Sequence, residues 1–235
     1  MNIVHLCDCM EFMKGVPDKY YELAIVDPPY GIGWTDTINY KTEKQKEHQV
    51  KKGYKIWDVK NWDKNRPDEK YFTELFRISK NQIIWGGNYF TDLLRPSKCW
   101  IVWDKQVDFT AVSNEMAWAS FNKRIFIFSR CVSLDKGFLE KDGHIHPTQK
   151  PVALYKWLLK NYAKPGDKIF DSHVGSGSIR IACHDMGFDF EGCEIDKDYW
   201  EAQEERYRQH SQQLELFDPQ TYQEKIVVGE LFNEK

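Results

Sequence analysis

Residues 21–30 have the sequence YELAIVDPPY, a mostly apolar run that ends in an acid, two prolines and a tyrosine. The run over 21–26 predicts a short buried strand. The two prolines after Asp27 end that strand, because proline donates no ladder hydrogen bond and holds the preceding residue in extended geometry. We therefore expect the tetrapeptide Asp27–Tyr30 at the carboxyl end of a strand, where open α/β sheets bind their ligands.

The tetrapeptide offers a carboxylate, backbone carbonyls fixed by proline geometry, and an aromatic ring. These groups fit a planar base with an exocyclic amine, which would donate to the carboxylate and a carbonyl while the base stacks on the ring. Such an amine is a poor nucleophile, and acceptors on both its hydrogens free its lone pair to attack an electrophilic methyl group. The candidate catalytic residues are therefore Asp27, Pro28, Pro29 and Tyr30. A proline turn without a chemical role is the alternative interpretation.

The chain has 235 residues, of which 41% are hydrophobic, as expected for one α/β domain with insertions. Glu11 and Lys14 interrupt any apolar signal sequence, and no segment is long enough to cross a membrane, so we expect a cytoplasmic protein without membrane contact. The six cysteines show no metal-binding spacing, so we expect reduced thiols and no metal. No cysteine follows a proline, which excludes the Pro-Cys nucleophile of C5-cytosine methylation.

Charge is unevenly distributed along a chain whose net charge is −3. Residues 41–70 carry ten Lys and Arg against six Asp and Glu, whereas residues 187–235 carry five against thirteen. This asymmetry predicts a basic insertion that faces nucleic-acid phosphates and an acidic C-terminal face that is turned away from them. A solvated, lysine-rich loop explains the basic segment equally well.

Hydrophobic periodicity predicts alternating strands and helices in one domain over residues 1–210. The short connection between the first two strands predicts that they pair in parallel through a crossover helix. Residues 31–70 lack a pattern and are predicted to form a mobile, DNA-facing insertion; residues 131–146 could form a short target-reading loop, and residues 211–235 a polar tail. The expected strands cover 2–6, 22–26, 82–85, 99–103, 113–121, 124–128, 168–171 and 188–193. The expected helices cover 9–15, 71–79, 178–185 and 196–209, together with one that residues 146–151 open and that runs to about residue 162.

The C-terminal half has the order strand, acid, glycine-rich turn, helix, strand, acid. Asp171 precedes the turn Gly175–Gly177, and Glu194 ends the next strand, where an acid can accept hydrogen bonds from ribose hydroxyls. The helix that begins at Ser178 offers backbone N–H groups to a carboxylate. A carboxylate, a ribose and no phosphate together favour S-adenosylmethionine as the cofactor. Asp171 and Glu194 could instead be ordinary strand-end acids that cap the next helices.

In this order the motifs resemble those of the β-group DNA amino-methyltransferases, and Asp-Pro-Pro-Tyr is most typical of the N6-adenine members. In that group the catalytic motif precedes the cofactor motif, a circularly permuted order, as residues 27–30 precede residues 171–178 here. The resemblance implies a Rossmann-like class I methyltransferase fold: a mostly parallel, twisted sheet with helices on both faces. It also implies methyl transfer from S-adenosylmethionine to the N6 amine of a flipped adenine in double-stranded DNA.

The resemblance spans residues 6–196 and also implies the cofactor site. The segment 146–151, HPTQKP, matches the group's late motif beside the cofactor, and Asp8 resembles the acid that meets the cofactor's adenine. The implied cofactor-binding residues are Asp8, Thr148, Lys150, Asp171, His173, Gly175, Ser176, Gly177, Ser178 and Glu194. Asp8 and Thr148 could instead be helix caps, and Lys150 a solvated charge.

The chain departs from the family pattern at the glycine loop. Ser172 and His173 stand where Asp-Pro-Phe is common, so His173 would replace the aromatic wall beside the methionine part of the cofactor. The target-reading region is small, which implies a short recognition site or a homodimer. Trp34, Trp57 and Trp62 could be intercalating or packing residues.

Three other functions remain open. The first is methylation of cytosine N4, although Ser is more usual than Asp at the first motif position of that group. The second is methylation of RNA or protein, because the basic segment 41–70 would fit other polyanions equally well. The third is a non-catalytic nucleic-acid-binding module of the same fold.

Overall fold

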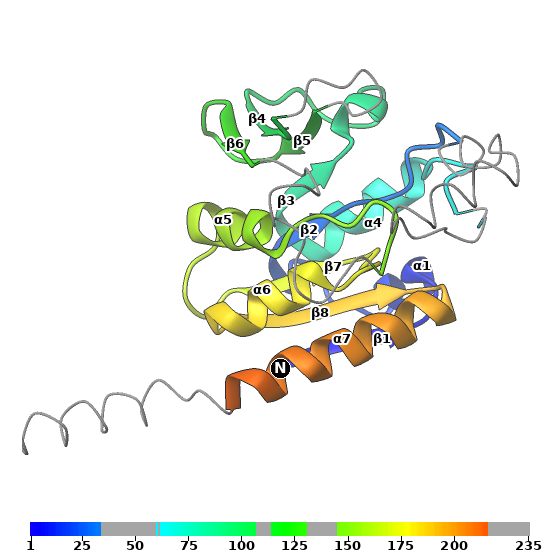
Figure 1. The fold of residues 1–235 in the computed structure, drawn as a ribbon. Helices are drawn as coiled ribbons and strands as arrows, with labels where there is room; N and C mark the ends of the chain where they lie inside the picture. The colour runs from blue at the N-terminus through cyan, green and yellow to red at the C-terminus, as the bar shows by residue number, and fades with distance from the viewer. Residues whose placement is uncertain (34–59, 61, 107–113, 131–144, 216–235) are drawn as a thin grey trace, which may run out of the picture.

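The computed structural model describes residues 1–33, 60, 62–106, 114–130 and 145–215 (Figure 1). Most of the predicted insertion over 31–70 lies outside these residues, as do most of the loop over 131–146 and residues 216–235 of the tail. Trp34 and Trp57 also lie outside them.

In the described part of the chain, eight strands form one sheet with the order β1-β8-β7-β2-β3-β5-β4-β6 (Figure 1). β5 runs antiparallel to β3 and β4, and all other neighbouring pairs are parallel. The predicted mostly parallel α/β sheet is therefore confirmed. The strands are β1 (Asn2–Leu6), β2 (Tyr21–Val26), β3 (Ser79–Trp85), β4 (Cys99–Asp104), β5 (Glu115–Ala119), β6 (Phe126–Ser129), β7 (Lys168–Asp171) and β8 (Asp189–Glu194).

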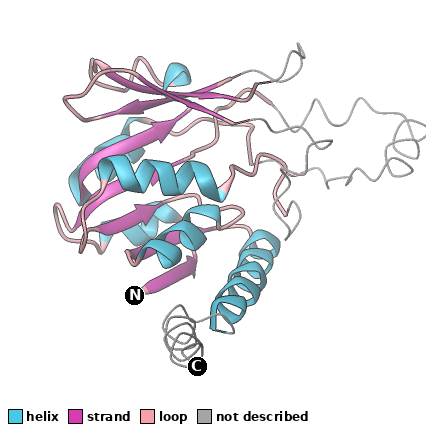
Figure 2. Cartoon of the chain, turned by 60° about the vertical axis from the view of Figure 1, so that its left-hand side comes forward, coloured by secondary structure: helices cyan, strands magenta, loops and turns pink. Residues whose placement is uncertain are grey.

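Helices cover both faces of the sheet, as the resemblance implied (Figure 2). α1 and α4 pack with a short 3₁₀ helix, η1, on one face, whereas α5, α6 and the first turns of α7 pack on the other. The helical segments are α1 (Cys9–Lys14), α4 (Glu69–Ile78), η1 (Gly87–Tyr89), α5 (Val152–Tyr162), α6 (Ser178–Met186) and α7 (Lys197–Glu215).

β2 lies in the middle of the sheet and is buried on both faces. Leu23 and Ile25 belong to the core under α5 and α6, whereas Ala24 and Val26 belong to the core under α1 and α4. This burial explains why the sequence shows a continuous apolar run rather than an alternation. Period-two geometry also directs Asp27, the next odd-numbered residue, toward the α5 side of the sheet.

The predicted pairing of the first two strands is wrong, although their parallel direction is correct. β1 pairs with β8, and β2 pairs with β7 and β3, so two strands from the C-terminal half lie between β1 and β2. A crossover connection fixes the relative direction of two strands but not whether another strand inserts between them.

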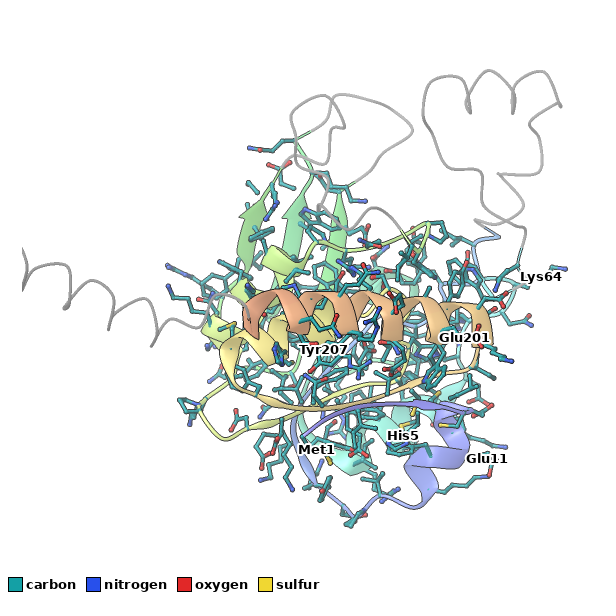
Figure 3. All side chains as sticks on the ribbon, turned by 60° about the horizontal axis from the view of Figure 1, so that its bottom comes forward. Met1, His5, Glu11, Lys64, Glu201 and Tyr207 are labelled. Atoms are coloured by element: carbon teal, nitrogen blue, oxygen red, sulfur yellow. The ribbon has the colours of Figure 1, made fainter. Side chains whose placement is uncertain are left out.

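α7 continues to Glu215, past the residue 210 at which the domain was expected to end. Figure 3 shows this helix crossing the near side of the molecule, with Tyr207 and Glu201 along it. The Trp200 indole of this helix donates to the carbonyl of Val4 on the edge strand β1 at 2.9 Å. Its Tyr207 ring centroid lies 3.9 Å from the guanidinium of Arg180 on α6. No helix in the described ranges has the length and apolar content needed to cross a bilayer.

Candidate active site

The predicted catalytic and cofactor motifs lie at one edge of the sheet. β2 and β7 are parallel neighbours, so Asp27, which follows β2, and Asp171, which ends β7, lie at the same edge. Glu194 ends β8, the next strand along, and Gly86 follows β3 on the other side. The sheet thus brings together two motifs that are separated by more than half of the sequence.

The Asp27 carboxylate has a different partner on each oxygen. Oδ1 accepts a hydrogen bond from the Tyr30 hydroxyl at 2.5 Å, and Oδ2 forms an ion pair with the Lys150 ammonium. The Asp27 side chain is 19% exposed, so it lies at the rim of the protein interior rather than deep within it.

The Tyr30 ring packs against aromatic side chains and against the backbone of Gly86. It stacks on Tyr89 with ring centroids 5.0 Å apart, and its edge meets Phe90. A Cβ atom on Gly86 would lie 2.2 Å from the ring, so only glycine leaves room for it. Burial, with help from the nearby Asp27 carboxylate, raises the pKa of Tyr30 well above its usual value, and the hydroxyl therefore stays protonated and donates to Asp27. Stacking of Tyr30 on a base stays a prediction.

Asp63 holds the backbone of the tetrapeptide, a role that the sequence analysis did not assign to it. Its Oδ1 accepts hydrogen bonds from the backbone N–H groups of Tyr30 at 2.8 Å and Gly31 at 3.0 Å, and the residue is 2% exposed. Asp63 comes from the predicted insertion. Its position after Trp62 was the only local signal that could have marked it.

Lys150 lies beneath the candidate catalytic acid and is 3% exposed. Besides Asp27 it forms an ion pair with Glu115 at 2.9 Å, and Glu115 in turn pairs with Lys105 at 2.6 Å. Burial acts to lower the pKa of Lys150, but the carboxylates of Asp27 and Glu115 outweigh it and raise that pKa overall. Burial likewise acts to raise the pKa of Glu115, and Lys150 and Lys105 lower it overall. Lys150 and Glu115 are therefore both charged, and Lys150 is not a solvated charge.

The glycine turn wraps around the Glu194 carboxylate. Glu194 Oε2 accepts from the backbone N–H of Gly175 at 2.8 Å, and Oε1 accepts from that of Asp196 at 2.9 Å. Gly175 and Gly177 have φ values of +53° and +72°, in the left-handed region that favours glycine. The turn thus brings backbone close to the acid that was predicted to bind ribose.

Two residues of the predicted cofactor set turn their hydroxyls inward. The hydroxyls of Ser176 and Ser178 lie 3.1 Å apart, and Arg206 of α7 donates to the Ser178 hydroxyl at 3.0 Å and to the Ser176 carbonyl at 2.8 Å. Ser178 is 1% exposed. These serines can therefore offer a ligand their backbone rather than their side chains.

Asp171 is buried and His173 is half-buried, and both are uncharged near neutral pH. Burial lowers the pKa of His173 to about 4, and its ring meets Tyr71 edge-on at 5.6 Å. Burial raises the pKa of Asp171 to about 8, although the backbone N–H of His173, which donates to Asp171 at 2.9 Å, opposes the shift. His173 thus presents a neutral aromatic ring, and its role as a wall beside the cofactor stays a prediction.

Asp8 caps α1, accepting from the backbone N–H of Met10 at 2.7 Å. Thr148, by contrast, does not cap α5, because the N-cap is Pro151; that alternative interpretation of Thr148 is wrong. The Thr148 hydroxyl instead lies 3.1 Å from Nδ1 of His146. An interaction of Asp8 or Thr148 with a cofactor stays a prediction.

The end of the predicted insertion contacts the cofactor side of the site. The His146 ring meets Tyr199 edge-on at 4.4 Å and Trp62 at 5.4 Å, which makes Trp62 a packing residue. Lys60 pairs with Asp196 and lies 4.4 Å from the ring centroid of Tyr199. Burial lowers the pKa of His146 to about 3, so this ring is neutral.

Within the described ranges, no group of three or more His, Cys, Asp or Glu side chains could hold a metal ion.

Comparison with known families gives one match over most of the chain. A family model described as DNA methylase, covering N6 and N4 methyltransferases, matches residues 36–205. The matched range begins after Asp27–Tyr30 and includes the glycine turn and Glu194.

The curated relatives are type II methyltransferases. M.HpaI of Haemophilus parainfluenzae is 36% identical over 69 residues, which are 29% of this chain and 22% of that protein. M1.MboII of Moraxella bovis is 22% identical over an alignment of 249 positions that covers 85% of this chain and 94% of that protein. The chain thus spans less than a quarter of the first relative and nearly all of the second.

Solved structures share the fold. The M1.HpyAVI complex with S-adenosylmethionine has a TM-score of 0.52 and 20% identity over 88% of this chain and 100% of that one. The cytosine-N4-specific PvuII DNA methyltransferase has a TM-score of 0.56 and 11% identity over 87% of this chain and 85% of that one.

Proposed function

This chain belongs to the DNA methylase family of S-adenosylmethionine-dependent N6 and N4 methyltransferases, and from that membership we propose that it methylates the N6 amine of adenine in double-stranded DNA. The observation that carries the proposal is the placement of Asp27 and the glycine turn at the ends of two neighbouring parallel strands. A substrate amine bound to Asp27 and the methyl group of a cofactor bound at the glycine turn would meet at that edge of the sheet.

Asp27 would accept one amino hydrogen of the base, and the carbonyl of Pro28 would accept the other. The Asp27 oxygens already contact Tyr30 and Lys150, but each carboxylate oxygen can accept two hydrogen bonds. Extrusion of the base costs a few kcal/mol, which stacking and edge contacts would offset. Asp at the first motif position favours adenine over cytosine.

The cofactor half offers suitable groups for S-adenosylmethionine, which supplies an electrophilic methyl group when bound. Glu194 retains free lone pairs for ribose hydroxyls, because each of its oxygens accepts one backbone N–H group. α6 has no side-chain cap at its start, so its first backbone N–H groups would be available to the carboxylate of the cofactor. The neutral ring of His173 would offer an aromatic face beside the turn.

DNA would be contacted by segments that lie mostly outside the described residues. We propose that the basic insertion over 31–70 faces the phosphates and that residues 131–146 contribute to target reading. The small size of these segments favours a short site or a homodimer.

Nucleoside mass spectrometry on DNA from cells that express the chain tests the proposal. We expect N6-methyladenine with the wild-type chain and none with Asp27→Ala, which should still bind S-adenosylmethionine in calorimetry. Asp104→Ala is the matched control, because Asp104 also ends a strand of this sheet, where its carboxylate accepts from the Gln106 backbone N–H and from the Ser129 hydroxyl. N4-methylcytosine would instead assign the chain to the alternative that the PvuII enzyme represents. Absence of both modified bases, with no cofactor binding, would favour a non-catalytic module.

A further inference from the structure

A second carboxylate, that of Glu115, lies one ion pair away from the candidate catalytic acid. Resting on the proposed function, we propose that Glu115 is a positioning residue: it shares the Lys150 ammonium with Asp27 and so keeps the Asp27 carboxylate available to the substrate amine. Nothing in the sequence motifs marks Glu115, which lies far along the chain from both of the other residues.

Sheet topology explains why Glu115 reaches the site. β5 is antiparallel to β3, so β5 begins at the edge where the parallel strands end. Trp85, the last residue of β3, is paired with Ala117, and Glu115 therefore lies beyond the end of β3. The first residue of an antiparallel strand thus joins the carboxyl-end residues of its parallel neighbours.

Lys150 is confined from several directions. Its Nζ atom pairs with Asp27 and, at 2.9 Å, with Glu115, and it lies 5.1 Å from the ring centroid of Trp85, which is fully buried. The Lys150 side chain is 2% exposed, so water screens these contacts weakly. If the Lys150 ammonium moved away from Asp27, it would also lose its ion pair with Glu115 and its contact with the Trp85 ring.

The charges in this cluster balance. Lys105 and Lys150 carry two positive charges, and Asp27 and Glu115 carry two negative charges, in the order Lys105, Glu115, Lys150, Asp27. If Glu115 became neutral, Lys150 would have Asp27 as its remaining carboxylate partner in this cluster and would be drawn toward it. The lone pairs of the Asp27 oxygens would then be less available to the substrate amine. The binding sites for the amine and the cofactor would themselves be unchanged.

The test measures single-turnover methyl transfer by Glu115→Gln, which keeps the shape and removes the charge. We expect the rate constant to fall by about 10- to 100-fold; this is less than the roughly 100- to 1,000-fold loss caused by removing a group that contacts the reacting atoms, because Glu115 acts through Lys150. The affinities for DNA and for S-adenosylmethionine should stay within about twofold of wild type. Glu22→Gln is the control: Glu22 forms an ion pair with Lys80 at 2.8 Å at the opposite end of β2, and we expect a wild-type rate.

A double variant separates positioning from stability. Lys105→Gln with Glu115→Gln restores charge balance but still leaves Lys150 without its second carboxylate. If the double variant is more thermally stable than Glu115→Gln but transfers methyl groups as slowly, the proposal is supported. If the double variant regains both stability and rate, or if Glu115→Gln alone has a wild-type rate, the proposal is overturned. If Asp27→Ala is inactive in the same assay, a wild-type rate in Glu115→Gln refutes this inference alone; if Asp27→Ala is active, the assignment of Asp27 fails and the inference fails with it.

Discussion

Close contacts around Tyr30 define the candidate site at the level of single residues. The Tyr30 hydroxyl holds one oxygen of Asp27, and its ring fills the space that Gly86 leaves open. Gly86 also has a φ of +67°, so it meets two independent requirements for glycine. A side chain at this position would disturb both the backbone and the candidate catalytic acid.

We predict that Gly86→Ala lowers the free energy of unfolding by about 1–3 kcal/mol through backbone strain, and abolishes most methyl transfer by displacing Tyr30. Gly166→Ala is the matched control, because Gly166 has a φ of +88° but a Cβ atom there would meet nothing within 4 Å. Urea unfolding and a methylation assay on both variants provide the measurement. Equal loss of activity in the two would contradict a special contact at Gly86.

Asp171 predicts a pH dependence of stability. Its pKa is about 8 in the folded protein, chiefly through burial, and near 3.8 ordinarily. Between these values the folded state keeps a proton that the unfolded state has released, so Asp171 makes stability fall as pH rises, by up to about 1.4 kcal/mol per pH unit. The charges that face it are Asp27 and Glu194, which raise its pKa, and Lys150, which lowers it.

Asp171→Asn should remove this contribution, because the amide cannot ionise and its oxygen can still accept from the His173 N–H. We expect the variant to gain stability relative to wild type as pH rises from 5 to 8, in urea unfolding without cofactor. Parallel stability curves for the two proteins would show that Asp171 is already ionised in the folded state.

Among the elements, the segment that includes residues 62–66 joins parts of the site. Asp63 holds the backbone after the tetrapeptide, and Trp62 packs on His146. Arg66 donates to the carbonyl of Tyr89 at 2.8 Å and pairs with Asp92. This segment therefore connects the catalytic tetrapeptide with η1 and with the HPTQKP motif.

Asp63→Ala should loosen the tetrapeptide, because two backbone N–H groups lose their acceptor, at a cost on the order of 1 kcal/mol each. We expect faster hydrogen exchange in the peptide that contains Tyr30 and Gly31, with slower methyl transfer. Asp63→Asn keeps an acceptor oxygen and should restore slow exchange. If exchange in Asp63→Ala matched wild type, the side chain would not be what holds this backbone.

At the scale of the whole molecule, the net charge of −3 predicts that DNA binding depends on where the basic residues lie. The proposed DNA-facing insertion contains Lys51 and Lys52, whereas Lys197 lies on α7 in the acidic part of the chain. Each phosphate contact contributes about 0.9 to the slope of log affinity against log salt concentration.

We therefore expect Lys51→Gln with Lys52→Gln to reduce that slope by up to about 1.8, and Lys197→Gln to leave it unchanged. Fluorescence anisotropy with a labelled duplex at several salt concentrations measures it. An unchanged slope in the double variant would place the phosphate contacts elsewhere.

Local sequence pattern was sufficient to predict most elements, the buried faces of β2, and the motifs at the strand ends. Proline chemistry placed Asp27 at the end of its strand, and glycine placed the turn before α6. These features depend on backbone preferences and on hydrophobic period, which are properties of neighbouring residues.

Strand order and the partners of Asp27 needed the folded molecule. The insertion of β7 and β8 between β1 and β2, the acceptor role of Asp63 and the pairing of Lys150 with Glu115 all join distant parts of the chain. Such contacts arise when whole elements pack around two cores. The composition and hydrophobic period of the two segments that meet do not predict that they will meet. Local chemistry could therefore predict Asp27 as the acid, but only the antiparallel course of β5 brings a second acid to its cation.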